Sequence, residues 1–177
     1  MELLISDHRE VEQLFEMMKA ARVTGNVDEQ RYVAEHVVED LSVHAVVEEE
    51  ILYPAMRDAL ADGDQLVDEA LEEHQEAKEL LTRIDGKDPQ SEDARAAFDQ
   101  LVASITHHVD EEEGELLPRL RSALGQERLQ QMGQKLEMAR KAAPTHPHPH
   151  APNTPPGNVA AGAFATVVDK IRDALRS

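Results

Sequence analysis

The sequence HAVVEEEILYP at residues 44–54 returns at residues 108–118 as HVDEEEGELLP. Each copy begins with a histidine, carries a glutamate four residues later and ends with a proline. A second match lies upstream of each copy, because DHRE at residues 7–10 corresponds to EHQE at residues 73–76. The interval from the upstream histidine to the downstream histidine is nearly equal in both cases. The first half of this region therefore repeats in the second half.

The repeated polar residues fall on the apolar sides of predicted helices. Residues four apart on an α-helix are separated by about 40° and one turn, so the histidine of each copy projects beside its glutamate. Apolar residues at helical spacing surround the whole polar set. The set consists of His8, His44, Glu48, His74, His108 and Glu112.

Helical periodicity through the first 125 residues predicts an all-α fold. Four helices are expected at about residues 6–24, 28–61, 65–84 and 91–123, with Ser6 or Asp7 capping the first and Pro54 kinking the second. The short connections favour antiparallel neighbours. We therefore expect an up-down-up-down four-helix bundle over residues 1–125.

The remainder of the chain predicts a helical C-terminal extension. Residues 126–142 fit one additional helix, and the proline-rich and histidine-rich residues 143–158 fit a semi-rigid linker. Residues 159–177 predict a short amphipathic helix that packs on the bundle or on a protein partner, which the sequence does not identify. Its apolar stripe contains Phe164, Val167, Val168, Ile171 and Leu175.

Composition excludes several classes of function. The formal net charge of -18 disfavours nucleic-acid and membrane partners, because phosphate groups would be repelled. The absence of cysteine excludes disulfides, iron–sulfur clusters and thiolate metal sites. No apolar run approaches the roughly 20 residues that cross a bilayer. Since the N-terminus also lacks the pattern of a signal peptide, a cytoplasmic location is expected.

Six ionisable residues inside a bundle core need compensating charge. An unpaired buried carboxylate costs several kcal/mol or more, and lysine and arginine do not occur on these stripes in matching numbers. Metal ions provide the compensation. Imidazole combined with carboxylate suits iron, manganese or zinc better than calcium or magnesium.

The sequence resembles the hemerythrin-like, or HHE cation-binding, domain family over roughly residues 1–125. The motifs that carry the resemblance are Asp7-His8, H-x-x-x-E-E before Tyr53-Pro54, His74, and H-x-x-x-E-E before Leu117-Pro118. The resemblance implies a four-helix bundle around two iron ions in an oxo-bridged, non-haem centre. The implied metal ligands are His8, His44, Glu48, His74, His108 and Glu112, with both glutamates bridging.

The chain departs from the oxygen carriers of this family. Those proteins have a further histidine four residues after the position of His74, where this chain has Lys78. They also have an aspartate five residues after the last histidine, where this chain has Glu112 four residues after His108. Simple reversible oxygen storage is therefore not expected. Tyr53 is a candidate substitute ligand, but ideal helix geometry places it about 180° from His44.

Other polar residues receive non-ligand interpretations. His107 could replace His108, since Glu111 follows it at the same spacing, but His108 aligns better with His44. Asp40, one turn before His44, either orients that imidazole or lies in solvent. The remaining assignments are solvent exposure for His36, Glu49, Glu50, Glu111 and Glu113, and a spacer role for His146, His148 and His150.

The leading functional hypothesis is a di-iron protein that binds or reduces a small oxidant, namely H2O2, O2 or NO. Decomposition of peroxide or handling of nitric oxide would be enzymatic, and no catalytic residue is assigned. The alternative is a non-enzymatic iron or oxygen sensor that signals through its C-terminal helix. A ferritin-like oxidase is ranked last, because such proteins use Glu-x-x-His rather than His-x-x-x-Glu.

Overall fold

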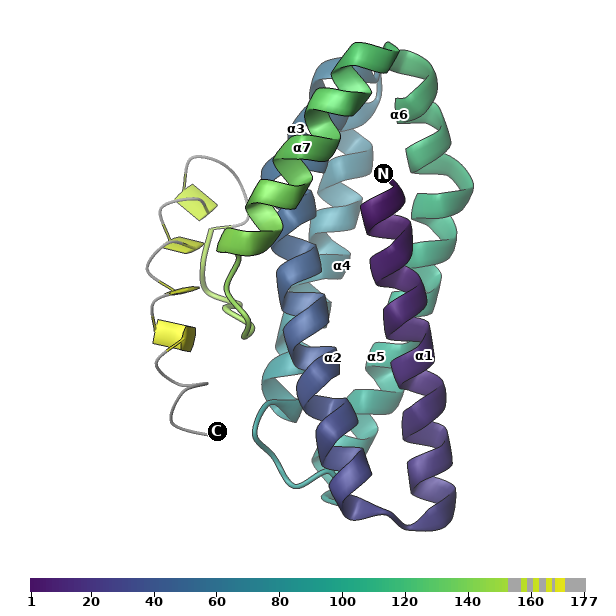
Figure 1. Ribbon diagram of the computed structural model, residues 1–177, viewed down its shortest axis with the longest axis vertical. Helices are drawn as coiled ribbons and strands as arrows, with labels where there is room; N and C mark the ends of the chain where they lie inside the picture. The colour runs from purple at the N-terminus through teal and green to yellow at the C-terminus, as the bar shows by residue number, and fades with distance from the viewer. Residues whose placement is uncertain (153–156, 159–160, 163–164, 167, 171–177) are drawn as a thin grey trace.

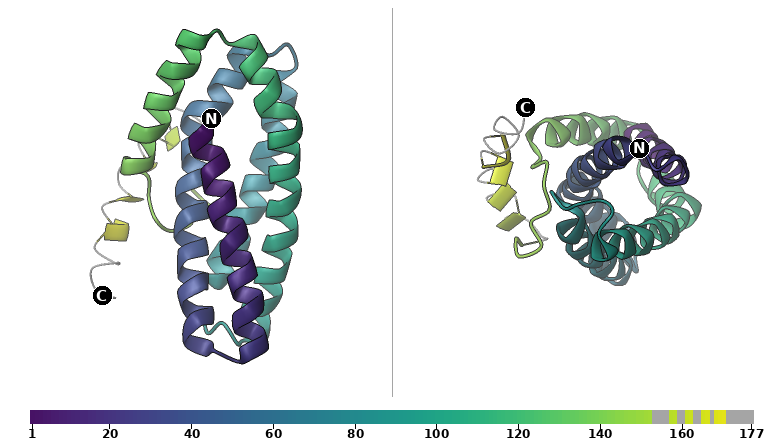
Figure 2. Two further views of the ribbon diagram at one scale, coloured as in Figure 1. Left: turned by 45° about the vertical axis from the view of Figure 1, so that its right-hand side comes forward. Right: turned by 90° about the horizontal axis from the view of Figure 1, so that it is seen from below.

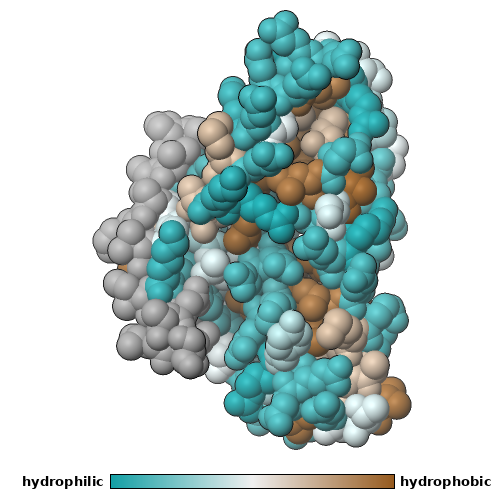
Figure 3. All heavy atoms as spheres, in the orientation of Figure 1, coloured by the Kyte–Doolittle hydropathy of each residue, from teal (hydrophilic) through white to brown (hydrophobic). Residues whose placement is uncertain are grey.

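The computed structural model describes residues 1–152, 157–158, 161–162, 165–166 and 168–170 of the chain. In this part of the chain every regular element is helical, and four long helical rods stand side by side (Figures 1 and 2). The predicted all-α bundle is therefore confirmed. Hydrophilic residues cover most of the face shown in Figure 3, as expected for a chain of this charge.

The two halves of the bundle contain the same series of elements. The first half is α1 (Glu2–Thr24), α2 (Val27–Val47), the π-helical turn η1 (Glu48–Leu52) and α3 (Tyr53–Ala59). The second half is α4 (Gly63–Ile84), α5 (Glu92–Glu111), the π-helical turn η2 (Glu112–Leu116) and α6 (Leu117–Ala123). Each π turn begins at the glutamate of the repeated motif. The internal repeat of the sequence is thus a structural repeat.

Local sequence explains where the helices end. Gly25 takes a left-handed conformation with φ of 68° and closes α1, which few other residues do without strain. Asn26 then caps α2 by accepting a hydrogen bond from the backbone N–H of Glu29. The N-terminus differs from the prediction, because α1 starts at Glu2 without a side-chain cap. Leu4 is completely buried, so packing of this first turn outweighs the missing cap.

Neighbouring helices run antiparallel around the bundle. α1 packs against α2, α4 against α5, and α2 against α4. The rings of Phe15 and Phe98 meet edge to face at 5.9 Å between centroids and so join α1 to α5. The four rods therefore enclose one interior, visible in the end-on view of Figure 2.

The interior contains two apolar clusters. The first is built around Phe15, Val37 and Phe98, and the second around Leu52, Met56 and Leu120. The histidines of the repeated motif occur in the sequence between residues of the two clusters. His8, for example, lies between Leu4 of the second cluster and Val11 of the first. A polar layer therefore divides the core.

The helix α7 (Gln126–Ala142) folds back across the outside of the bundle (Figure 1). It packs against α1, α2 and η1, and Met132 and Leu136 are buried in the second apolar cluster. This element corresponds to the additional helix predicted at residues 126–142.

The proline-rich segment differs from the spacer that the sequence predicted. His146 is buried, and its Nδ1 lies 3.2 Å from Oδ2 of Asp85 at the end of α4. The amide of Gln75 donates to the carbonyl of Pro149 at 3.2 Å. Burial and these polar contacts hold the segment against the bundle. Of the predicted C-terminal helix, residues 161–162, 165–166 and 168–170 are helical, and the rest lies outside the described residues.

Within the described part of the chain, none of the helices combines the length and the apolarity needed to cross a lipid bilayer.

The packing of α7 predicts a specific loss of stability. Leu136 is 0 % exposed, so Leu136→Ala should lower the free energy of unfolding by about 2–5 kcal/mol. Met138 on the same helix is 63 % exposed, and Met138→Ala should change it by less than about 0.5 kcal/mol. Urea denaturation followed by circular dichroism measures both. Equal effects of the two variants would show that α7 does not belong to the folded body.

Candidate metal centre

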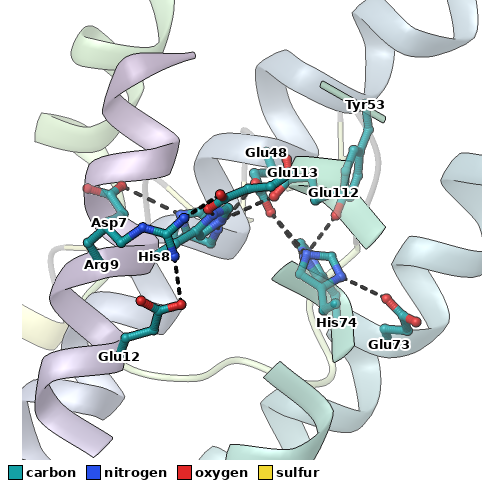
Figure 4. A network of polar contacts seen from close by, with 12 residues as sticks. Asp7, His8, Arg9, Glu12, Glu48, Tyr53, Glu73, His74, Glu112 and Glu113 are labelled. Atoms are coloured by element: carbon teal, nitrogen blue, oxygen red, sulfur yellow. Dashed lines mark hydrogen bonds and ion pairs between the residues drawn. The ribbon is translucent and has the colours of Figure 1, made fainter. Parts of the chain in front are cut away.

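The structure brings all six predicted ligands into the polar layer. Each of the six residues is at most 5 % exposed. The histidines come from four different helices: His8 from α1, His44 from α2, His74 from α4 and His108 from α5. Glu48 and Glu112 occupy the first positions of the π turns η1 and η2. Figure 4 shows the two carboxylates lying between His8 on one side and His74 on the other.

One group of possible ligands contains His8, His44, Glu48 and Glu112. Their donor atoms all lie within 4.8 Å of one another. Nε2 of His8 is 3.1 Å from Nε2 of His44 and 3.1 Å from Oε2 of Glu112. Nε2 of His44 is 3.2 Å from Oε1 of Glu48. Two imidazoles and two carboxylates thus converge on one point.

A second group consists of Glu48, His74 and His108. The other oxygen of Glu48, Oε2, lies 3.2 Å from Nε2 of His74 and 3.7 Å from Nε2 of His108. Glu48 therefore presents one oxygen to each group, as a bridging carboxylate would. Glu112 faces the first group, and its role as a second bridge stays a prediction.

The buried donor atoms are poorly satisfied by the protein. Both carboxylate oxygens of Glu48 and of Glu112 lack an aligned hydrogen bond from the described residues, and so does Nε2 of His108. Their neighbours lie at ion-pair distance but outside hydrogen-bond geometry. Leaving buried polar atoms in this state costs about 1–3 kcal/mol each or more. Metal ions would satisfy these atoms, so the donor set fits a two-metal centre.

A carboxylate faces the outer nitrogen of every imidazole in the layer. Nδ1 of His8 is 2.8 Å from Glu113, and Nδ1 of His74 is 3.0 Å from Glu49. These two carboxylates follow the glutamate ligands in the sequence. Each crosses to a histidine of the opposite half. Such partners orient a metal-binding imidazole and raise its basicity.

The other two outer carboxylates act within their own half. Oδ2 of Asp7 lies 3.5 Å from Nδ1 of His44, and Oε2 of Glu73 lies 2.7 Å from Nδ1 of His108. Both residues directly precede an upstream histidine. The sequence prediction considered Asp40 for the orienting role, whereas the structure places Asp7 there. The match between Asp7-His8 and Glu73-His74 in the repeat was the signal for this pair.

Burial of Glu49 is a correction to the sequence prediction. Glu49 is 2 % exposed instead of lying in solvent, and it accepts a hydrogen bond from Nζ of Lys78 at 2.6 Å. Lys78, at the position of the missing histidine, is itself 7 % exposed. The ammonium group thus neutralises the carboxylate that orients His74. Glu113 is partly buried, whereas Glu111 remains exposed.

Tyr53 lies in the layer, contrary to the estimate from an ideal helix. Its hydroxyl is 2.9 Å from Nε2 of His74. The π turn η1 explains the difference, because one extra residue in the turn reduces the rotation from His44 from about 180° to about 80°. The phenol oxygen is therefore placed beside the donors of the second group.

His107 lies on the surface rather than in the buried layer. Its Nε2 is 3.5 Å from Glu111 and 3.8 Å from Glu73. His36 is also outside the layer and bonds through Nδ1 to the carbonyl of Tyr32 at 2.8 Å. The buried histidine of the adjacent pair is His108, as its alignment with His44 predicted.

The buried charges shift the pKa values of the ligands in opposite directions. Burial lowers the pKa of His108, but its contacts with Glu48 and Glu73 outweigh burial and raise the pKa from 6.5 to about 10. Burial raises the pKa of Glu48, yet the charge of His44 and the close approach of the imidazoles of His108 and His74 hold that pKa well below 4.5. Imidazolium groups therefore compensate the ionised Glu48.

Glu112 behaves differently from Glu48. Burial raises the pKa of Glu112, and the negative charge of Glu48 raises it further. Two neighbouring carboxylates in a dry site resist joint ionisation. A divalent or trivalent cation removes this conflict, which again favours metal at this site.

A small cavity adjoins the layer on the side of the first apolar cluster. Its volume is about 20 Å³. This space is enough for one molecule about the size of water. Its walls include Val11, Leu41, Ala77, Leu81, Ile105 and Val109, together with all four histidines. We call it the inner cavity.

The fold and the site together define a helical-bundle protein with a buried cation-binding centre. Residues 1–120 of the chain match the family model of the hemerythrin HHE cation binding domain. It is 32 % identical over 173 residues to an uncharacterized hemerythrin-like protein of Schizosaccharomyces pombe, covering 97 % of this chain and 84 % of that protein. The chain therefore belongs to the hemerythrin HHE family, as its motifs indicated.

A second relative is a DNA nickase of Nostoc sp., to which the chain is 30 % identical over 134 residues. This match covers 76 % of the chain and 37 % of the relative. No solved structure gives a significant match.

Metal binding should weaken as the pH falls. Nε2 of His108 must lose its proton before it can bind a metal ion, and its pKa near 10 means that the proton is still present at neutral pH. Metal uptake should therefore release protons. Calorimetric titration in buffers of different ionisation enthalpy counts them, and uptake without proton release would contradict the assignment.

The folding stability of the metal-free chain should decrease as the pH rises. Folding raises the pKa of His108 from 6.5 to about 10, so protonation of this imidazole stabilises the fold. The contribution is fully present below pH 6.5 and is lost as the pH rises toward about 10. The thermal midpoint of the chelator-treated protein should fall across this range. His108→Gln should flatten the dependence.

Proposed function

We propose that this chain binds two iron ions in its buried layer and that the centre binds or reduces hydrogen peroxide, dioxygen or nitric oxide. One observation carries the proposal: two groups of possible metal ligands share Glu48 and adjoin a small apolar cavity, and the carboxylates of both glutamates and Nε2 of His108 lack hydrogen bonds from the described residues. His8 and His44 would hold one ion, and His74 and His108 the other. Glu48 and Glu112 would complete the centre.

The donor chemistry supports a redox-active metal. Imidazole and carboxylate together suit iron, manganese and zinc, of which zinc has no redox chemistry. A small oxidant in the inner cavity would lie beside the donor atoms, where a metal that exchanges electrons could react with it. Bound iron would supply electrons to the oxidant.

The protein contributes orientation and exclusion of water. An outer carboxylate faces Nδ1 of each imidazole and favours the orientation with Nε2 turned inward, so the ligands are largely organised before metal arrives. Aliphatic side chains line much of the inner cavity and disfavour bulk water. Burial raises the pKa of Tyr53 well above 10, so its hydroxyl keeps its proton beside His74. These groups favour small uncharged molecules in the inner cavity.

DNA cleavage is not part of this proposal. The chain spans 37 % of the Nostoc DNA nickase, so most of that relative has no counterpart in the match. The net charge of -18 also opposes contact with a phosphate backbone.

Replacement of single histidines tests the proposal. His44→Ala and His108→Ala should each lower the iron content of protein from iron-supplemented cells and weaken its near-ultraviolet absorption. His36→Ala and His107→Ala should leave both unchanged, because these residues lie outside the layer. Elemental analysis and absorption spectra provide the measurement. Equal iron content in all four variants would refute the ligand set.

Peroxide turnover tests the reaction itself. Oxygen release or peroxide loss after addition of H2O2 should occur with the iron-loaded chain and disappear in His108→Ala. Iron binding without any reaction toward peroxide, dioxygen or nitric oxide would contradict an oxidant-handling role and leave the second function.

The second function is metal sensing through the C-terminal extension. Its structural support is Arg140 of α7, which pairs with Asp7, the carboxylate that faces His44. A change at His44 can thus reach α7 through one carboxylate. Metal occupancy and docking of α7 would then be linked.

Arg140→Gln measures this link. The variant should weaken metal affinity by about tenfold, a typical effect of losing an outer partner of a metal ligand. Metal removal should also raise amide hydrogen exchange in α7 of the wild-type chain. Arg128→Gln is the matched control, because Arg128 on the same helix pairs with Asp58 away from the site. Identical metal affinity in both variants would contradict the link.

A further inference from the structure

Two cavities meet at one lysine. Lys78 lines the inner cavity at the metal layer, and it also lines a second cavity with a volume of about 40 Å³. We call the latter the outer cavity. On the bundle side it is lined by Ser42, Val46 and Glu49. Lys78 therefore separates the space at the ligands from a space nearer the surface.

The C-terminal segment forms the other wall of the outer cavity. Pro144, His146, Pro152 and Ala161 are among the residues that line this side. The polar contacts of the segment to Gln75 and Asp85 hold it over the face between α2 and α4. The segment thus encloses a space that leads toward the metal layer.

We propose that the outer cavity is the entry route for a small uncharged oxidant, which reaches the inner cavity by passing Lys78. The significance of the route rests on the proposed function, but its existence does not depend on bound metal. Nζ of Lys78 is held by Glu49, and its four-carbon stem has several rotatable bonds. Rotation of this stem opens the partition without displacing any of the six ligands.

A competing route exists on the side of Asp7. Asp7 also lines the inner cavity, and it lines a third cavity with a volume of about 230 Å³. That third cavity is bordered by charged groups, including Glu10, Glu39 and Arg140. Asp7 has a short side chain, and its movement would break its contacts with Arg140 and His44. Asp7 faces the ligand His44 directly, whereas Lys78 is connected to the ligand His74 only through Glu49.

The route is tested in the chelator-treated full-length chain with one introduced thiol. The sequence has no cysteine, so Val11→Cys places a single thiol at the wall of the inner cavity. The rate of its oxidation by H2O2, followed by mass spectrometry, reports arrival of peroxide. Ala103→Cys, at an exposed position, controls for the reagent itself.

Two valines on α2 provide matched blocking variants. Val46 lines the outer cavity and Val43 lines the third cavity, and both are half-buried. Val46→Phe should slow oxidation of the inner thiol by about fivefold or more, equivalent to roughly 1 kcal/mol added to the barrier. Val43→Phe should leave the rate unchanged. The opposite result places the route at Asp7, and equal rates in all variants likewise overturn the proposal.

A second variant acts from the opposite wall. Ala161→Phe fills the outer cavity from the C-terminal segment and should slow the inner thiol in the same way. Val168→Phe is its control, because Val168 is exposed and is not among the residues that line the outer cavity. An unchanged or higher rate in Ala161→Phe would overturn the proposal even if Val46→Phe failed to fold.

The iron-loaded chain separates failure of the route from failure of the proposed function. With normal iron content, Ala161→Phe should slow binding of nitric oxide in stopped-flow absorbance by about fivefold or more. Absence of iron would refute the proposed function, whereas the thiol measurement would still decide the route. Unchanged nitric oxide binding with full iron content would overturn the route alone.

Discussion

The structure depends on a layer of ionisable donors buried between two apolar clusters. Six ligand side chains and several outer carboxylates share this layer, at most 5 % exposed for the ligands themselves. Burial of such groups opposes folding unless each charge is compensated. The bundle meets this constraint with imidazoles beside carboxylates and with unsatisfied inner atoms that suit metal ions. Metal binding and folding of this region are therefore expected to be coupled.

The approximate symmetry of the bundle serves the same layer. Each half supplies one histidine from its first helix, and one histidine and one glutamate from its second. The outer carboxylates of the π turns, Glu49 and Glu113, reach across to the opposite half. The centre consequently forms only when both halves are assembled. The symmetry is broken at Lys78, where a buried ammonium group lies beside one orienting carboxylate.

The C-terminal extension surrounds the symmetric core unequally. α7 contacts the layer through Arg140 and Asp7, and the following segment covers the face near Lys78 and Glu49. Both contacts concern carboxylates that orient histidines. The extension is thus in a position to influence metal occupancy and access of small molecules, although it supplies none of the six ligands.

The sequence alone determined the helical class, the repeat and the six buried residues, because helical periodicity is a local property and the motif recurs. It placed Glu49 in solvent, Tyr53 away from the site and His146 in a spacer, and only the tertiary structure corrected these assignments. A π turn changes the angular register after Glu48, and the burial of Glu49 depends on α4, distant in sequence. Packing between remote segments, which no local pattern encodes, decided how the centre is oriented and enclosed.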